Sequence, residues 1–325
     1  MKKLNLIAAA TVLTASTSAY ADPVLIEQWS FINEAGFSNW TTVGSGTNSL
    51  EASGDSSDGG TSILSTGALP DNLCWGDPVN ANNDQSCLSI NSPVSNETTQ
   101  SWDEDGMMVD INGGAPQGNA MTVAIGGDYT TAFKQGTAVR HNNFPITGEM
   151  LDTVSIRDGL RLEAVAPEGV VVNAPELEFM VDFWETPNGG LDADGTCPFG
   201  PPSRTPGSVN ENGCSDIFKI VGFDGAGDLN IVDSGEGFID FSVKFTVTGV
   251  DASEYHRNYE LITRLSGLDV TFDDEGVGFV TRENGVNILN AQFAVRAIDA
   301  PEPSTLAVFA VSLLGLAGFS RRKFK

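Results

Sequence analysis

Histidine and basic side chains are scarce in this sequence. Its 325 residues include 2 histidines and 17 lysines and arginines against 43 aspartates and glutamates, which gives a formal net charge of −26. A surface this acidic repels nucleic acid and anionic lipid, so no nucleic-acid partner is expected. With two histidines and no Cys-x-x-Cys pair, a zinc site is not expected either.

Two common hydrolase signatures are also missing. The chain has no Gly-x-Ser-x-Gly nucleophile elbow and no His-Glu-x-x-His metalloprotease motif. We therefore predict no catalytic residues and a protein that is not an enzyme. A hydrolase that uses pairs of Asp or Glu side chains stays open as an alternative, because a sequence does not show whether two carboxylates converge in a cleft.

The first 21 residues have the layout of a secretory signal peptide. Lys2 and Lys3 give a positive start, an apolar run follows from Leu6 to Leu13, and small residues lead to Ala21. The apolar run is too short to span a bilayer. We predict cleavage before Asp22 and export of the chain.

The last 26 residues, 300–325, combine three features in order. A Pro-Glu-Pro sequence at Pro301, Glu302 and Pro303 precedes an apolar stretch at 305–320, and a basic end follows. The stretch predicts a transmembrane helix, slightly short of the ~20 residues that a comfortable span needs. Its basic end is expected to stay on the cytoplasmic side. A plain anchor would not explain the prolines.

This tripartite end resembles the PEP-CTERM sorting signal. The resemblance implies that a membrane-embedded exosortase recognises Pro301, Glu302 and Pro303 and removes the tail. It also implies an inner-membrane stage through the tail, followed by delivery to the cell surface or an extracellular matrix, often one rich in exopolysaccharide. The three motif residues would then be a substrate for processing and not a catalytic site.

Four cysteines lie in the body of the chain, and an even number in an exported protein favours disulfides. Three pairings are possible. We favour Cys74 with Cys87 and Cys197 with Cys214, because each pair brackets a loop rich in Asn, Asp, Gly or Pro. Metal ligation is the alternative.

Strand patterns recur through residues 22–299, whereas helix signals are scarce. Apolar residues alternate with polar ones in several segments, as expected for half-buried strands. The predicted strands are Leu25–Phe31, Met121–Ile125, Leu160–Val165, Leu177–Trp184, Ile217–Phe223, Phe238–Val247, Tyr259–Leu265 and Phe293–Ile298. Many strands separated by turns indicate one all-β domain, a β-sandwich or jelly-roll-like fold. Residues 41–62 predict a long loop or a weak hairpin.

Several short motifs occur along this domain in a fixed order. They are Cys74–Pro78, Ser89–Ile90, Ala138–Ile146, Glu185–Asn188, Asn212–Phe218 and Gly278–Asn284. Taken together they resemble a group of PEP-CTERM proteins named for a Thr-His-x-Asn motif. Here His141 and Asn143 match, and Arg140 replaces the threonine. The family has no established biochemical activity, so the resemblance implies a class of proteins but no mechanism of action.

The role of His141 stays open between two interpretations. It can orient a ligand, act as a base or bind a metal. Alternatively, it can form a hydrogen bond with the backbone near a strand end, as Asn143 would before Pro145.

His256 lies in a polar stretch and is expected to be exposed. Glu185 is expected to end a strand before a turn; Asp182 and Glu178, its possible acid–base partners, fall on the solvent face.

Two acidic loops have the composition of calcium sites. One contains Asp192 and Asp194; the other offers Asp224, Asp228, Asn230 and Asp233. Alternating oxygen donors among glycines suit calcium, although neither loop completes the twelve-residue EF-hand pattern. Calcium is thus the one cofactor considered, and a solvated acidic surface is the alternative.

The sequence as a whole predicts a non-enzymatic protein exported to the cell surface or matrix. Exosortase is its expected processing partner, with exopolysaccharide as a further possible one. The first alternative is a carbohydrate-binding module that uses Trp75, Trp102 or Trp184 as exposed aromatic platforms.

Overall fold

The structure is a computed structural model that describes residues 23–57, 60–79, 84–90, 116–224, 230–235, 237–252, 254–273 and 276–299. The predicted signal peptide, at 1–21, and the predicted sorting tail, at 300–325, lie outside these residues. Within the described ranges no helix is long and apolar enough to cross a membrane.

Every regular element in the described part of the chain is a β-strand. The strands are β1 (Gln28–Val43), β2 (Glu51–Ser53), β3 (Asn72–Trp75), β4 (Asp77–Pro78), β5 (Ser86–Ile90), β6 (Gln117–Val123), β7 (Lys134–Asn143), β8 (Ile146–Thr147), β9 (Met150–Ala164), β10 (Val171–Asn173), β11 (Leu177–Trp184), β12 (Asp216–Asp224), β13 (Asn230–Gly235), β14 (Phe238–Thr246), β15 (Asn258–Ser266), β16 (Asp269–Asp273), β17 (Gly276–Thr281) and β18 (Gly285–Ala297). The all-β prediction is confirmed for these residues.

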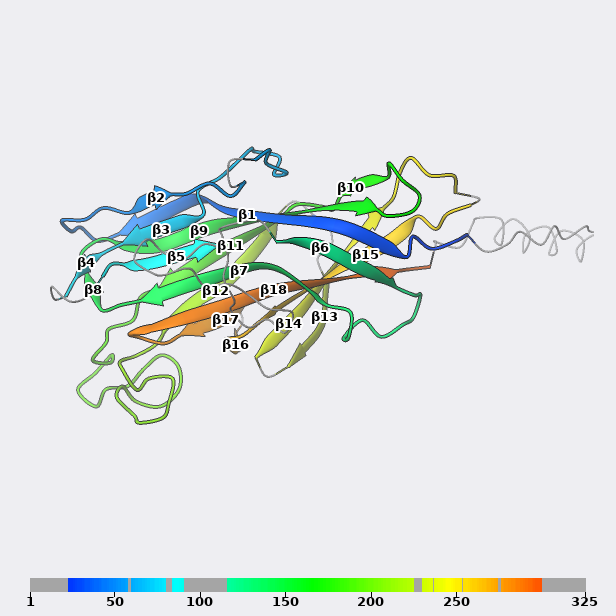
Figure 1. The fold of residues 1–325 in the computed structure, drawn as a ribbon. Coiled ribbons are helices and arrows are strands. Elements are labelled where there is room, and N and C mark those ends of the chain that lie inside the picture. The colour runs from blue at the N-terminus through cyan, green and yellow to red at the C-terminus, as the bar shows by residue number, and fades with distance from the viewer. Residues whose placement is uncertain are drawn as a thin grey trace, which may run out of the picture.

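Sixteen of the strands form one continuous mixed sheet, and β4 pairs with β8 separately. One arm of the sheet contains β1, β9, β10, β11, β12, β16 and β17; we call it the first arm. The second arm contains β2, β3, β5, β7, β13, β14, β15 and β18. Strand β6 joins the arms, because it pairs antiparallel with β1 and parallel with β18. Figure 1 shows β1, in blue, running along most of the body.

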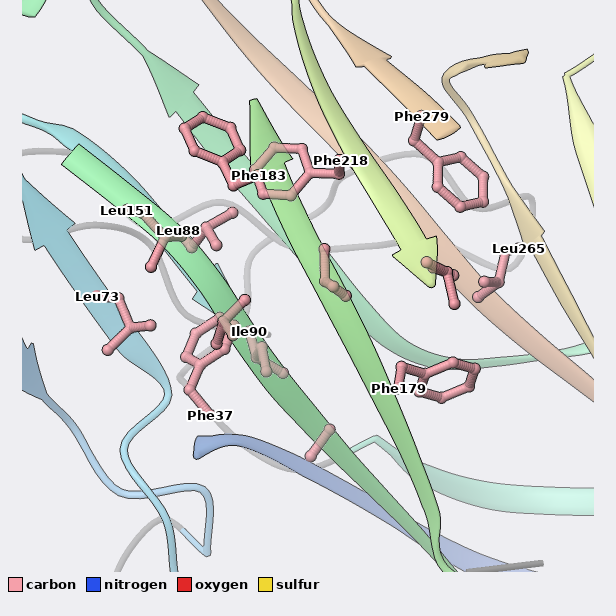
Figure 2. Close-up of a cluster of buried hydrophobic side chains, with 14 of the residues drawn as sticks. Phe37, Leu73, Leu88, Ile90, Leu151, Phe179, Phe183, Phe218, Leu265 and Phe279 are labelled. Atoms are coloured by element: carbon pink, nitrogen blue, oxygen red, sulfur yellow. The ribbon is translucent and has the colours of Figure 1, made fainter. Parts of the chain in front are cut away.

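The two arms share one main hydrophobic core. Buried Phe37, Phe183 and Phe218 from the first arm belong to the same cluster as Leu88 and Leu265 from the second. Figure 2 shows Phe183 and Phe218 next to each other, and their ring centroids are 4.5 Å apart. Each fully buried side chain of this size contributes about 1.5–3 kcal/mol through removal of apolar surface from water. This burial holds the arms face to face.

Strand β11 shows why the sequence specifies this packing. Leu177, Phe179, Val181 and Phe183 are buried, and the residues between them are exposed or half-buried. A strand with this period places one apolar face on the core. The predicted bounds of β11 are confirmed residue for residue.

All eight predicted strands are present, but β1, β6, β9 and β18 begin or end several residues away from their predicted bounds. Strands β1, β9 and β18 extend through polar segments with 16, 15 and 13 residues. Most of the other strands, β7 and β17 among them, were not predicted from the sequence. Within 41–62, β1 continues to Val43 and β2 forms a short strand, so that segment is only partly a loop.

A polar cross-link ties the arms together beside the main core. Asn33 on β1 donates through Nδ2 to Asp158 Oδ1 on β9 at 2.7 Å, and its Oδ1 accepts from the Thr137 amide on β7 at 2.8 Å. Burial raises the pKa of Asp158 to about 6 from its ordinary value of 3.8. Between about pH 4 and pH 6 the folded side chain therefore holds a proton that it releases when the chain unfolds.

The Asp158→Asn variant should change how stability depends on pH. Asparagine keeps the oxygen that accepts from Asn33 and removes the buried charge. Because the folded pKa is raised, the wild-type protein loses stability as pH rises from about 4 to about 6, whereas this contribution is absent from the variant. Chemical denaturation should show the variant gaining up to about 3 kcal/mol over wild type between pH 4 and pH 7. A stability difference that does not change with pH would contradict this account.

Candidate functional site

The motifs noted in the sequence converge at one end of the two arms. Strand pairing places Asn143 opposite Gly285, Asp216 opposite Thr281, and Trp184 opposite Ile217. The ends of β7, β11 and β17 therefore meet the beginnings of β12 and β18. Figure 1 shows these ends on the same side of the molecule, next to the long β11–β12 connection.

Three carboxylates form a buried cluster at this end. Glu185, Asp216 and Glu283 each offer an oxygen atom, and these oxygens lie within 4.8 Å of one another. Asp216 and Glu283 are 0% exposed, and Glu185 is half-buried. Three acidic groups this close and this buried are unusual in a protein interior, because each charge loses its hydration.

Local hydrogen bonds fix the first two members of the cluster. Glu185 follows the end of β11, and Asp216 opens β12 on the neighbouring strand. The Thr186 amide donates to Asp216 Oδ1 at 2.8 Å. The Thr186 hydroxyl donates to the carbonyl of Cys214 at 2.8 Å, which joins the two ends of the β11–β12 connection.

The third member, Glu283, lies in the tight β17–β18 turn. This turn passes from the first arm to the second, and Asn284 adopts a positive φ of 52° within it. Asparagine tolerates this left-handed conformation better than most residues. Asn212 Nδ2 donates to the Glu283 carbonyl at 3.2 Å and ties the turn to the β11–β12 connection.

The β11–β12 connection is held against the cluster by a disulfide. Cys197 and Cys214 are bonded, with 5.3 Å between their Cα atoms. Gly213, next to this bond, has a φ of 152°, and a Cβ there would lie 2.6 Å from Asn188 Oδ1 and 3.1 Å from Glu283 Cγ. Only glycine allows the connection to approach the cluster so closely.

His141 lies beside the cluster in an aromatic enclosure. Its ring stacks on Trp75 at 5.7 Å and meets Phe183 and Phe218 edge-on at 5.5 and 5.0 Å. Its Nδ1 contacts the Thr281 hydroxyl at 3.1 Å. Burial lowers the pKa of His141 to about 3, so the ring is neutral at physiological pH. No carboxylate among the described residues hydrogen-bonds to its ring, as a catalytic triad would require.

Asn143 borders the cluster from the second arm. It is 0% exposed, and its Nδ2 donates to the Thr281 carbonyl at 3.3 Å. Its amide also lies beside the Asp216 carboxylate and lowers the pKa of that group. Asn143 therefore donates a hydrogen bond to the backbone, as one of the two interpretations of the motif predicted. Its side chain also lies beside the Asp216 carboxylate.

The electrostatics of the cluster are dominated by lost hydration. Burial raises the pKa of Asp216 to about 7 and that of Glu283 to about 8, and repulsion from Asp216 adds to the second shift. The pKa of Glu185 also lies well above its ordinary value, first through burial and then through repulsion from the other two carboxylates. Without a cation nearby, these groups hold shared protons near neutral pH.

Acceptor oxygens outnumber donors around the cluster. Glu185 Oε2, Asp216 Oδ2 and Asn143 Oδ1 are buried and make no hydrogen bond within the described part of the protein. Asn188 Oδ1 faces only acceptors; if its amide is turned over, the nitrogen donates to both Glu283 oxygens at 3.0 Å. An arrangement rich in oxygens can hold protons or a hard cation.

Several sequence predictions can be set against this geometry. The disulfides Cys74–Cys87 and Cys197–Cys214 are both present. Asp182 is exposed as expected, and Glu178 pairs with Arg157 at 2.7 Å. The partners of Glu185 are instead Asp216 and Glu283, which the sequence could not pair because they are distant in the chain. The one available signal was that each lies in a separate one of the short motifs noted in the sequence.

Two further expectations about exposure were wrong. His256 is 8% exposed, and its Nε2 contacts the carbonyls of Asn258 and Ile298 at 2.7 and 2.8 Å. Trp75 is 0% exposed and cannot present a sugar platform, whereas Trp184 is 51% exposed. Trp102 lies outside the described residues. Both errors arise because long-range packing covers segments that are locally polar.

The predicted calcium loops are not brought into the cluster. Asp233 and Asn230 lie exposed on β13, and Asp228 falls outside the described residues, as does the chain from 225 to 229 next to Asp224. Asp192 Oδ1 accepts from the amides of Asp194 and Thr196, which closes its own loop. Calcium binding by either loop stays a prediction.

Comparison with known proteins identifies one segment of the chain. A family model described as the PEP-CTERM protein-sorting motif matches residues 299–323. The chain carries a PEP-CTERM sorting motif. The motif marks an exported protein that is sorted by an exosortase and passes through the membrane. No curated protein matches the sequence.

The Asp216→Asn variant should stabilise the protein in a chelating buffer. Because the folded pKa of Asp216 is about 7 and its ordinary value is 3.8, the wild type loses stability as pH rises through this interval. Asparagine keeps the oxygen that accepts from Thr186 and removes one buried charge. Denaturation at pH 8 should show a gain of roughly 1–3 kcal/mol, and a smaller gain at pH 5. Asp182→Asn, an exposed carboxylate on the same strand as Trp184, is the control and should change neither value.

Proposed function

We propose that the protein is a non-enzymatic component of the cell surface or the extracellular matrix, of the Thr-His-x-Asn type. The observation that carries the proposal is the sorting motif at residues 299–323, which follows a strongly acidic, disulfide-bonded β domain. Disulfides suit a protein that works outside the reducing cytoplasm. The acidic surface suits a soluble protein in a hydrated, cation-rich matrix.

The proposed route begins with a signal peptide at residues 1–21. The apolar stretch at 305–320 would then hold the chain in the membrane as a helix, with Pro301, Glu302 and Pro303 presented to the exosortase outside it. Proline keeps this short segment non-helical and therefore accessible. Removal of the tail would release a domain of residues 22–299, whose facing arms we regard as a sandwich-like architecture.

The geometry of the carboxylate cluster supports a role other than hydrolysis. Glycosidases place their two carboxyl groups about 5–9.5 Å apart on either side of a substrate. Here the oxygens lie within 4.8 Å, and Asp216 and Glu283 are 0% exposed. A sugar ring has no access to groups in this position, and His141 lacks an acidic partner.

Changing the sorting motif should change where the protein accumulates. Replacing Pro301, Glu302 and Pro303 with alanine keeps the apolar stretch and the basic end but removes the segment that the exosortase recognises. Fractionation of the producing cells should show the variant retained in the membrane fraction as a longer chain, and the wild type released and shorter. Ser304→Ala is the matched control and should behave as wild type. Identical fractionation and mass of all three proteins would contradict the proposal.

Exopolysaccharide binding is a second candidate function, favoured by the exposure of Trp184. Its ring lies on the outer face of β11. Met180 lies on the same face, four residues earlier in the strand. An exposed aromatic ring can stack on a sugar. Trp184→Ala should lower affinity for purified exopolysaccharide about tenfold, whereas Met180→Ala should not, because it removes apolar surface without a ring. Equal affinities for both variants and wild type would argue against sugar binding at this face.

A further inference from the structure

We propose that Glu185, Asp216 and Glu283 form a calcium site, with the Asn188 amide oxygen as a fourth ligand, and that the ion ties the two arms of the sheet together. The proposal concerns the folded domain and does not rest on the sorting function. It is also distinct from the two acidic loops that the sequence singled out.

The distances within the cluster fit one shared ion. Calcium binds oxygen ligands at about 2.3–2.6 Å, so two ligands on opposite sides of an ion are at most about 5 Å apart. The three carboxylate oxygens all lie within 4.8 Å of one another. No movement of the strands is needed to bring them onto one ion.

The pattern of unsatisfied oxygens points independently to a cation. Buried polar atoms in proteins nearly always have partners. Asn143 Oδ1 is buried and has no donor in the described structure, and its amide lies beside Asp216. Turning over the Asn188 amide would satisfy Glu283, but Glu185 Oε2, Asp216 Oδ2 and Asn143 Oδ1 would still lack donors. A cation held among the three carboxylates would give Glu185 Oε2 and Asp216 Oδ2 the partner that they lack in the described structure.

Among the described residues, no lysine or arginine forms an ion pair with the cluster. None of the ion pairs between described residues involves Glu185, Asp216 or Glu283, in contrast to Asp240, which Arg264 contacts through two nitrogens at 2.7 and 2.8 Å. The nearby indole of Trp75 faces Glu185 but makes no hydrogen bond of normal geometry. A bound cation would displace the shared protons and supply the positive charge that the described side chains do not.

The chemistry of the ligands selects calcium among the common metals. All four ligands are oxygens, which suit calcium or magnesium, whereas zinc prefers nitrogen and sulfur. His141 uses Nδ1 to contact Thr281 and both nearby cysteines are bonded to each other, so neither residue type competes for the ion. Magnesium usually keeps several bound waters, which two fully buried carboxylates leave little room for.

The position of the ligands explains what the ion would do. Glu185 and Asp216 belong to the first arm, whereas Glu283 lies in the turn that leads from that arm into the second. An ion held between them would close the end of the shared core. Because the ligands come together only in the folded chain, binding would stabilise the fold.

Calorimetric titration of the purified full chain with calcium, after dialysis against a chelator, tests the proposal. We expect one site of this kind, with a Kd between about 10 μM and 1 mM, as is usual for extracellular calcium modules. At ~5 mM calcium the melting temperature should rise by about 3–8 °C, and by less with magnesium at the same concentration. No heat and no change in melting temperature with calcium, or an equal response to magnesium, would overturn the assignment.

Variants then locate the ion. Asp216→Asn keeps the bond from the Thr186 amide and should lower calcium affinity at least tenfold, as should Glu283→Gln. Asp182→Asn changes an exposed carboxylate on β11 and should retain wild-type affinity. Asp233→Asn changes β13, in the second acidic loop that the sequence predicted to bind calcium, and should also retain it. Loss of the thermal response in Asp233→Asn but not in Asp216→Asn would place calcium in that loop and overturn the proposal. Two cluster variants are used so that a folding defect in one, seen by circular dichroism, leaves the other as the test.

Discussion

Three acidic groups confined between two arms of one sheet set the main physical constraint on this molecule. Glu185, Asp216 and Glu283 lose most of their hydration where the core ends, and no basic side chain among the described residues compensates for that loss. The surrounding structure is organised around them. The strand ends, the β17–β18 turn and the disulfide-bonded β11–β12 connection all bring polar atoms to this one location. The neighbouring main core is packed with aliphatic and aromatic side chains.

The sequence predicted the strands whose burial alternates locally and missed those whose burial depends on distant partners. Strand β11 was predicted within its true bounds because Leu177, Phe179, Val181 and Phe183 alternate with polar neighbours. Strand β7 was missed because its buried residues include His141 and Asn143, which are polar and find their partners on β17. Local periodicity carries no information about such partners.

The candidate site was visible in the sequence only as fragments. The motif segments were noted in chain order, and the only partners considered for Glu185 were nearby carboxylates on its own strand, which the pattern placed on the solvent face. Its real partners are about 30 and 100 residues further along the chain, and they meet it only because β12 pairs with both β11 and β17. Sheet topology of this kind cannot be deduced from one sequence, so the site emerged from the fold. The sorting motif, in contrast, is a linear signal and was fully readable.

Strand β18 ends at Ala297, two residues before the segment that matches the sorting motif. It pairs with β7 along its first part, with β15 along its second, and with β6 near its end. As long as the tail stays attached, any mechanical force transmitted through it would load this strand along its own axis. Many hydrogen bonds to neighbours on both sides would then have to break together, so the domain is tethered through a strand that is paired along its whole length and would resist being pulled apart by flow.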